Sequence, residues 1–222
     1  MEGGKHMGRN ALVKEFKGRH DHKDYIKRGI KTENIFIDEA VKLGYQVEVA
    51  SDSQNMSDHI DLILTKEEIK FTVDVKARRT GTDKSKGFDD LWIVVEFKNT
   101  MGNQGWLYGK CDYFVFEQED KYLLVDSKEL RELCHEVVDL NDRVNSFRNA
   151  NYKVWGRSYQ NKQDLISRIE TSKVLQLNNT FIWKKSIDFS NQVCDNSILN
   201  ITKGNNMSVI KGNAHWASIT SP

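Results

Sequence analysis

The segment that most constrains the fold runs from residue 60 to residue 77, where two apolar runs are separated by a short polar turn. The runs IDLILT (60–65) and IKFTVDVKA (69–77) are rich in β-branched and aromatic residues. Such runs predict strands, and the short Lys-Glu-Glu connection predicts that they pair as an antiparallel hairpin. The chain must therefore build a sheet that contains this pair.

Helices and further strands are predicted on both sides of this pair. Apolar residues at helical spacing predict a helix over about 32–43, with Thr32 as its N-cap and Gly44 after its end. The other predicted elements are strands at 45–51 and 91–98, a hairpin at 112–126, and a helix at 127–138 capped by Ser127. This order predicts an α/β (α+β) domain, with a central mixed β-sheet flanked by helices.

The two ends of the chain are less regular than this core, which we place at residues 32–140. Residues 1–31 form a basic N-terminal arm with nine Lys/Arg against four Asp/Glu, which favours a solvated arm or one that lies on phosphates. Residues 141–185 are interpreted as a C-terminal extension, with a strand at 152–160, a short helix at 163–172 and a strand pair at 173–185. Residues 186–222 are interpreted as an appended small element or a tail.

Composition narrows the class of protein. Lys and Arg number 33 against 32 Asp and Glu, so the overall charge does not indicate a nucleic-acid binder and any such evidence must be local. No apolar run approaches the roughly 20 residues of a membrane helix, and the N-terminus lacks the apolar core of a secretory signal. Cys111, Cys134 and Cys194 are far apart, which predicts neither a disulfide framework nor a cysteine zinc site. We expect a cytoplasmic protein that does not bind membranes.

The only proline, Pro222, and the abundant Lys and Asn are typical of AT-rich genomes such as those of many phages.

The residues that carry chemistry lie on the predicted strand pair. Residues two apart in a strand point to the same face, so Asp74 and Lys76 project together while the valines beside them point into the core. Asp61 stands near the start of the preceding strand, within reach of Asp74. Two carboxylates converging at a strand end form a hard oxygen site of the kind that Mg²⁺ prefers, and a lysine beside them can stabilise charge on a phosphate. Glu33, in the first turn of the predicted helix, is a candidate further carboxylate.

This arrangement resembles the PD-(D/E)xK nuclease superfamily over about residues 30–126. The matching elements are a helix with an acid, a strand, an Asp near a strand start, and Asp-x-Lys in the following apolar strand. The resemblance implies a restriction-endonuclease-like nuclease core and Mg²⁺-dependent hydrolysis of DNA, with Mn²⁺ as an alternative ion. It implies that Asp61, Asp74 and the backbone carbonyl of Val75 hold the metal, that Lys76 handles the attacking water, and that Glu33 binds a metal or water from the helix side.

The spacing is most similar to archaeal-type Holliday-junction resolvases and small phage-encoded nucleases, which implies branched DNA as substrate and a homodimer. Two positions depart from the family pattern: Ile60 stands where the family has proline, and Asp74 stands where Glu is more frequent. A sequence-specific restriction-type endonuclease and a catalytically inactive DNA-binding module remain alternatives.

Several further residues are candidates. The loop after the motif is basic, which predicts contacts with the DNA backbone; its candidates are Arg78, Arg79, Lys84 and Lys86. The resemblance implies that a polar residue borders the site, and Gln104 is the candidate. Trp106 and Tyr108 are predicted to close an edge of the core or to stack on a base. Asp58 is a rival to Asp61, and the pair Glu96 and Lys98 is a rival to Asp74 and Lys76.

Overall fold

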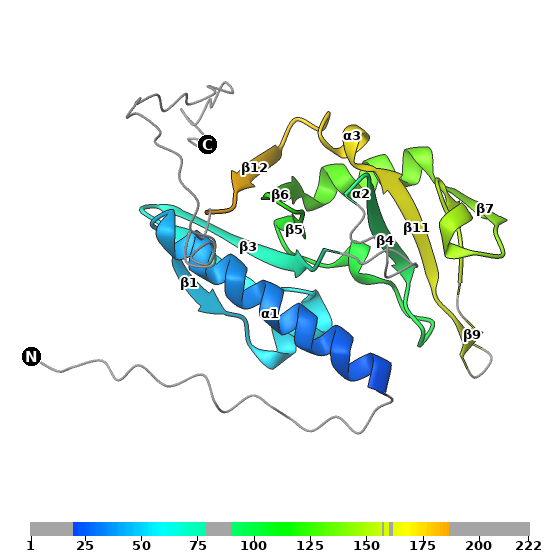
Figure 1. Cartoon of the computed structure of the whole chain (residues 1–222), viewed down its shortest axis with the longest axis horizontal. Coiled ribbons are helices and arrows are strands. Elements are labelled where there is room, and N and C mark those ends of the chain that lie inside the picture. Colours follow the sequence, from blue (N-terminus) through cyan, green and yellow to red (C-terminus); the bar gives the residue numbers. More distant parts are fainter. Residues whose placement is uncertain (1–19, 79–89, 157, 160–161, 187–222) are drawn as a thin grey trace, which may run out of the picture. The chain divides into compact units, whose positions relative to one another are not determined.

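A mixed six-stranded sheet is the framework of the protein in the computed structural model, which describes residues 20–78, 90–156, 158–159 and 162–186 (Figure 1). Its strands, in spatial order, are β1 (Gln46–Val49), β2 (Leu62–Lys66), β3 (Ile69–Lys76), β5 (Tyr113–Glu117), β6 (Lys121–Asp126) and β12 (Thr180–Lys184). Neighbouring strands are antiparallel except β3 and β5, which are parallel. The predictions of a mixed sheet and an α+β fold are confirmed, as are the strands at 45–51, 60–65 and 69–77 and the hairpin at 112–126.

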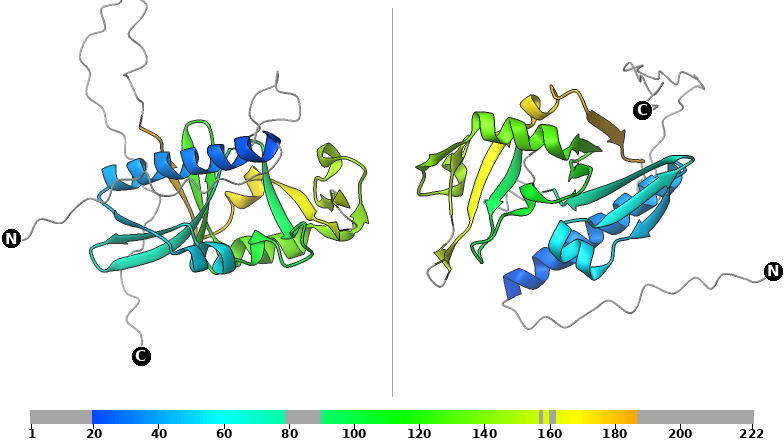
Figure 2. Two further views of the ribbon diagram at one scale, coloured as in Figure 1. Left: turned by 90° about the horizontal axis from the view of Figure 1, so that it is seen from below. Right: turned by 180° about the vertical axis from the view of Figure 1, so that it is seen from behind.

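Helix α1 (His20–Lys42) runs across β1 to β3 on one face of the sheet (Figure 2). Its Phe36 and Ala40 are fully buried against residues of the sheet, among them Leu64 and Val73. The predicted start of this helix is wrong, because Thr32 lies in mid-helix rather than at the N-cap. Four of the five glycines in residues 1–31 precede residue 20. Within residues 20–31 only Gly29 interrupts the pattern, and one glycine costs a helix only about 1 kcal/mol.

Helix α2 (Ser127–Val137) covers the opposite side of β5 and β6. Its Leu130 and Cys134 are fully buried in a second apolar cluster that includes Phe114 and Val125. The N-cap is Asp126 rather than the predicted Ser127, because the Asp126 carboxylate accepts hydrogen bonds from the amides of Lys128 and Glu129, both at 2.9 Å. Both candidates are good capping residues, so the sequence alone did not separate them.

Strand β4 (Trp92–Lys98) lies outside the main sheet and pairs antiparallel with β11 (Leu165–Glu170). It confirms the strand predicted at 91–98, and its buried and half-buried residues alternate. The predicted helix at 163–172 is wrong: that segment is β11, followed by the single turn α3 (Thr171–Val174). Pairing with β4 decides this segment, since tertiary contacts override weak helical spacing.

The remaining elements are short. Strands β7 (Asp139–Arg143) and β8 (Lys153–Val154) pair in parallel, and β9 (Ser158–Tyr159) pairs with β10 (Lys162–Gln163). The predicted strand at 152–160 is thus present as two short pieces, and the predicted strand pair at 173–185 is the single strand β12. Among the described residues, no helix is both long and apolar enough to cross a membrane. The predicted element at 186–222 lies outside the described residues, apart from Ser186.

Candidate functional site

Strand β3 presents Asp74 and Lys76 together on one face, as the two-residue repeat predicts. Asp74 is 2% exposed, and the Lys76 Nζ lies 2.6 Å from its Oδ2. Val73 and Val75 point to the other face, into the apolar cluster under α1. A carboxylate this deeply buried is stable in its charged form only beside a cation, which Lys76 supplies from the same strand.

Asp61 closes the end of this strand pair with its side chain. Its amide donates to the Val73 carbonyl at 2.8 Å, but its carboxylate Oδ2, rather than its carbonyl, accepts from the amide of Val75 at 2.7 Å. The other carboxylate oxygen, Oδ1, accepts from the Asn55 side chain at 2.6 Å. In a strand, the amide and carbonyl of one residue point to the same edge, so the Val75 carbonyl faces the same edge as the Asp61 carboxylate.

The electrostatics of this group are unusual. Burial, together with the negative charge of Asp74, raises the pKa of Asp61 to about 7, against the opposing effect of Lys76. Burial and the charge of Asp61 raise the pKa of Glu33 on α1 to about 7, and Lys76 again opposes the rise. Glu33, Asp61, Asp74 and Lys76, which we call the strand-end cluster, therefore place three carboxylates around one ammonium.

The donor set fits a divalent cation. Asp61, Asp74 and the Val75 carbonyl are hard oxygen donors at one strand end, and Mg²⁺ is usually held by one or two carboxylates, with water and substrate completing its shell. Burial, and after it the charge of Asp74, raises the pKa of Asp61, and a bound cation would favour the charged carboxylate. Within the part of the chain that the structure describes, no three His, Cys, Asp or Glu side chains group closely enough to hold a metal. Glu33 interacts with Asp61 and Lys76 through its charge.

The rival residues have other partners. Asp58 pairs with Lys110 at 2.8 Å. Glu96 lies on β4, outside the main sheet, where its carboxylate accepts from the amide of Trp106 at 3.4 Å. Asp61, in contrast, accepts a hydrogen bond from the amide of Val75, the residue between Asp74 and Lys76.

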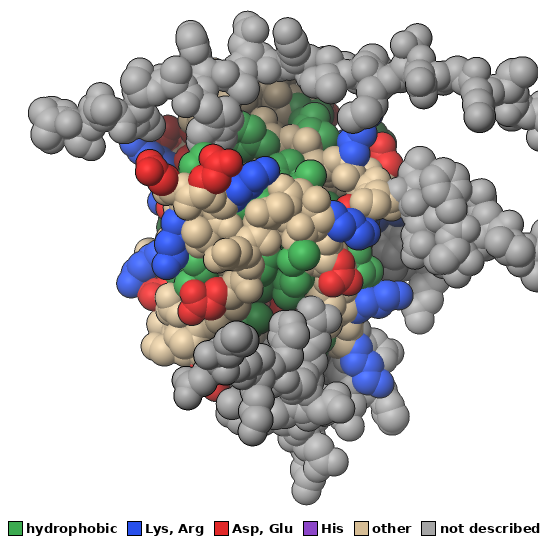
Figure 3. Space-filling model, turned by 90° about the vertical axis from the view of Figure 1, so that its left-hand side faces the viewer, with side chains coloured by type: hydrophobic (Ala, Val, Ile, Leu, Met, Phe, Trp, Pro, Cys, Tyr) green, Lys and Arg blue, Asp and Glu red, His purple; other side chains and the backbone are tan. Residues whose placement is uncertain are grey.

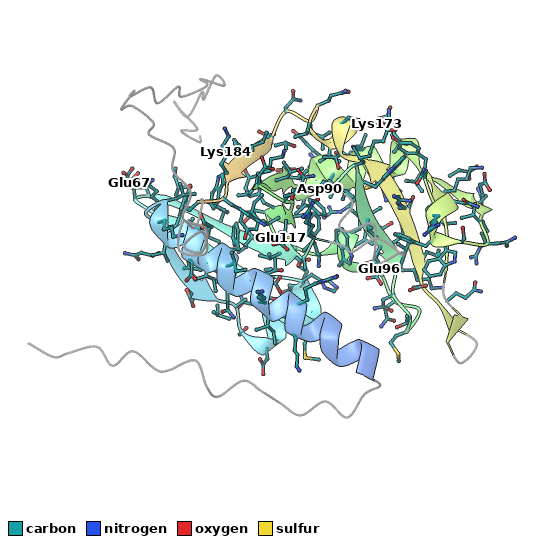
Figure 4. The ribbon with its side chains drawn as sticks, viewed as in Figure 1. Glu67, Asp90, Glu96, Glu117, Lys173 and Lys184 are labelled. Atoms are coloured by element: carbon teal, nitrogen blue, oxygen red, sulfur yellow. The ribbon has the colours of Figure 1, made fainter. Side chains whose placement is uncertain are left out.

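The predicted DNA-contacting residues are not gathered at the site in the described structure. The Arg78 guanidinium pairs with Asp90 at 2.6 and 2.9 Å and with Glu119 at 3.1 Å, so it is occupied by carboxylates. Its partner Asp90 is labelled in Figure 4. Gln104 is exposed on a turn and forms a β-bridge with Lys98. The other three candidates lie outside the described residues; they are Arg79, Lys84 and Lys86.

Two residues touch the strand-end cluster that sequence reasoning did not assign to it. Asn55 lies in the π-helix η1 (Gln54–Asp58) and holds Asp61. Trp106 lies in the 3₁₀ turn η3 (Trp106–Tyr108), and its ring centroid is 4.7 Å from the Lys76 Nζ. An asparagine in a polar turn gives no distinctive signal. Trp106 stood out as an aromatic residue after the motif, but its contact with Lys76 depends on how β4 and β5 are arranged.

The class that the fold and the site define is a mixed-sheet α+β protein with an acidic, lysine-containing site at a strand end. No family model matches the chain, and no curated protein matches it. Among solved structures, the chain is similar to a bacterial homing endonuclease, I-Ssp6803I, at 19% identity and a TM-score of 0.37, over 48% of this chain and 72% of the other. A likeness of this size does not establish a family.

Proposed function

We propose that this chain is a metal-dependent DNA endonuclease that hydrolyses phosphodiester bonds. The observation that carries the proposal is the convergence of Asp61 and Asp74 at one strand end, with the Lys76 ammonium 2.6 Å from Asp74. A buried pair of carboxylates next to a lysine is costly to build. Such a cost is typical of functional sites, where perturbed pKa values cluster.

Each residue then has a role. Asp61, Asp74 and the Val75 carbonyl would hold Mg²⁺ or Mn²⁺. When bound, the cation supplies charge that neutralises a phosphate and makes an adjacent water more acidic. Lys76 would lie beside the position where negative charge develops on the phosphate and would orient the attacking water. Glu33 on α1, whose charge interacts with Asp61 and Lys76, would bind a metal or water from the helix side.

The basic half of α1 supports DNA as the substrate. Lys27 and Lys31 are exposed and spaced four residues apart, so they lie on one face of the helix in the turns before Glu33. On the face drawn in Figure 3, acidic and basic side chains of the described residues are mixed. That face therefore lacks the uniformly positive electrostatic potential that would attract phosphates. We therefore assign the phosphate contacts to Lys27 and Lys31, together with the basic loop that begins at Arg79.

The finer proposal concerns the DNA structure. A branched junction is the preferred substrate in this proposal, and a homodimer would place one strand-end cluster on each of two strands. A restriction-type enzyme would instead cut linear duplex at a defined sequence. The two are separated by substrate choice rather than by the chemistry of the site.

A cleavage assay tests the proposal on supercoiled plasmid, linear duplex and four-way junction DNA, with Mg²⁺, Mn²⁺ or EDTA. Asp74→Ala should lower cutting by about 100-fold or more, because it removes a metal-binding carboxylate. Asp58→Ala is the matched control, since Asp58 comes from the same region but pairs with Lys110. DNA binding, followed by fluorescence anisotropy, should survive in Asp74→Ala because the substitution reduces repulsion of phosphate.

Two outcomes would contradict the proposal. Cutting that persists in EDTA would show that the reaction needs no metal. Equal cutting by Asp74→Ala and the unaltered chain would show that Asp74 is not part of the active site. In the second case Glu96 and Lys98 become the next pair to test. If no substrate is cut but one is bound tightly, the chain is a DNA-binding module instead.

A further inference from the structure

Trp106 lies outside the motif but contacts its lysine. The Lys76 ammonium has the Asp74 carboxylate at 2.6 Å, and the centroid of the Trp106 ring lies 4.7 Å from the same nitrogen. The Lys76 side chain is 26% exposed, so the carboxylate and the ring leave it a limited opening to solvent. A cation over an aromatic face is attracted by the negative charge of the ring surface.

The fold holds this ring in place from two directions. On the β4 side, the Gly105 amide donates to the Phe97 carbonyl at 3.0 Å, and a Cβ on Gly105 would lie 2.2 Å from the Glu96 carbonyl oxygen. Only glycine allows this close approach of backbone to backbone. On the β5 side, the indole packs edge-on against Phe114, with ring centroids 5.0 Å apart. The first contact fixes the backbone next to Trp106, and the second packs the ring itself between Phe114 and Lys76.

We propose that Trp106 is a positioning residue for Lys76, a role that rests on the proposed nuclease function. A lysine has four rotatable bonds and loses much rotamer freedom when it is held in one place. The indole face and the Asp74 carboxylate together restrict the Lys76 ammonium before substrate arrives. The ring accepts no conventional hydrogen bond, and an ammonium has three N–H donors, so donors remain for a phosphate oxygen or a water.

The same contact argues against a base-stacking role for Trp106. A base that stacked on this indole face would have to displace the ammonium of Lys76, which is bound to Asp74. The ring therefore acts on the site through Lys76 rather than by touching the DNA bases.

Kinetics with three tryptophan variants test the proposal. Trp106→Leu removes the ring but keeps an apolar side chain, and Trp106→Phe keeps a smaller ring. Trp155→Leu is the matched control, because Trp155 is also half-buried but packs on Phe147. We expect kcat to fall about tenfold in Trp106→Leu with KM nearly unchanged, and Trp106→Phe to recover most of the loss. The control should cut like the unaltered chain, and thermal unfolding verifies that each variant is folded.

A second measurement does not depend on cleavage. In metal-free protein with isotope-labelled lysine, the ε-methylene protons of Lys76, assigned with Lys76→Arg, should resonate upfield, because the Nζ bonded to this methylene lies over the indole. The upfield shift should vanish in Trp106→Leu and persist in Trp155→Leu. An ordinary resonance position in the unaltered chain overturns the proposal, as does a lost shift with unchanged kcat. If the unaltered chain cuts no DNA, the proposed function fails, and the proton shift still decides whether the ring holds Lys76.

Discussion

Two charged clusters stand at the end of β3 and β5, and their balance of charge differs. The first is the strand-end cluster. The second, which we call the Glu117 cluster, comprises Thr32, Arg78, Asp90, Glu117, Glu119 and Lys185. Glu117 accepts hydrogen bonds from the Thr32 hydroxyl at 2.9 Å, the Arg78 amide at 2.9 Å and Lys185 at 3.0 Å. Burial alone would raise the pKa of Glu117, but these hydrogen bonds outweigh burial and lower it.

The strand-end cluster has fewer cations for the same number of carboxylates. It holds three carboxylates and one cation, whereas the Glu117 cluster holds three carboxylates and two cations. Burial and neighbouring carboxylates raise the pKa values of Asp61 and Glu33 to about 7. A half-buried cluster with matched donors stabilises the fold and has no need of a ligand. A cluster with surplus negative charge is destabilised until a cation or protons neutralise it. Under the proposed function, this difference separates a structural charge network from the candidate metal site.

The largest expected effect comes from removing the lysine of each cluster. Methionine keeps the aliphatic part of a lysine and removes its charge. Lys76→Met should lower cleavage about 100-fold or more, because it removes the cation beside the reacting phosphate. Lys185→Met should leave cleavage within about threefold but lower the free energy of unfolding by about 1–3 kcal/mol, because Glu117 loses a charged donor. Cleavage at 25 °C and urea unfolding measure the two effects.

The opposite result for either lysine would contradict the comparison between the two clusters. If Lys185→Met abolished cleavage in a folded protein, the Glu117 cluster would have to be part of the functional site. If Lys76→Met cut normally, the surplus charge of the strand-end cluster would have no catalytic meaning.

The motif residues were predictable because the information lies within one strand pair. The alternation of residues 69–77 fixes the shared face of Asp74 and Lys76, and the short turn brings Asp61 beside them. The start of α1 was not predictable, because its first turns combine weak helical spacing with Gly29. β11 was taken for a helix because only its pairing with β4 shows what it is. The contact of Trp106 with Lys76 was hidden for the same reason, since segments far apart in sequence form it.

The second-largest expected effect is the contribution of Asp61 to the pH dependence of folding stability. In the folded state Asp61 keeps its proton up to a pH of about 7, whereas its ordinary pKa is 3.8. Between these values the folded state binds a proton that the unfolded state releases, so Asp61 makes stability fall as pH rises and adds no further change above about 7. Asp61→Asn removes this dependence. The Tm of metal-free Asp61→Asn should therefore gain on that of the unaltered chain from pH 4 to 7, by several degrees at about 2–4 °C per kcal/mol.

Added Mg²⁺ sharpens this test. At pH 8 it should raise the Tm of the unaltered chain, because a ligand of the folded state stabilises it, and it should raise the Tm of Asp61→Asn much less. If the Tm of the two proteins changed with pH in parallel, the pKa of Asp61 would not be raised in the folded state. The contrast with Glu117 would then disappear.

The smallest effect concerns Asn55, which belongs to neither cluster but supports one of them. Its side chain donates to the Asp61 Oδ1 at 2.6 Å from η1, a helix that contains no buried residue. Asn55→Ala should therefore cost little stability, within about 1 kcal/mol, yet lower cleavage roughly tenfold, because an unsupported metal-binding carboxylate loses its orientation. Gln54→Ala is the matched control, since Gln54 lies in the same helix and bonds to Ser51 instead. Equal losses of cleavage in the two variants would assign the effect to the conformation of η1. A loss of cleavage confined to Asn55→Ala would assign it to the hydrogen bond between the Asn55 side chain and the Asp61 carboxylate.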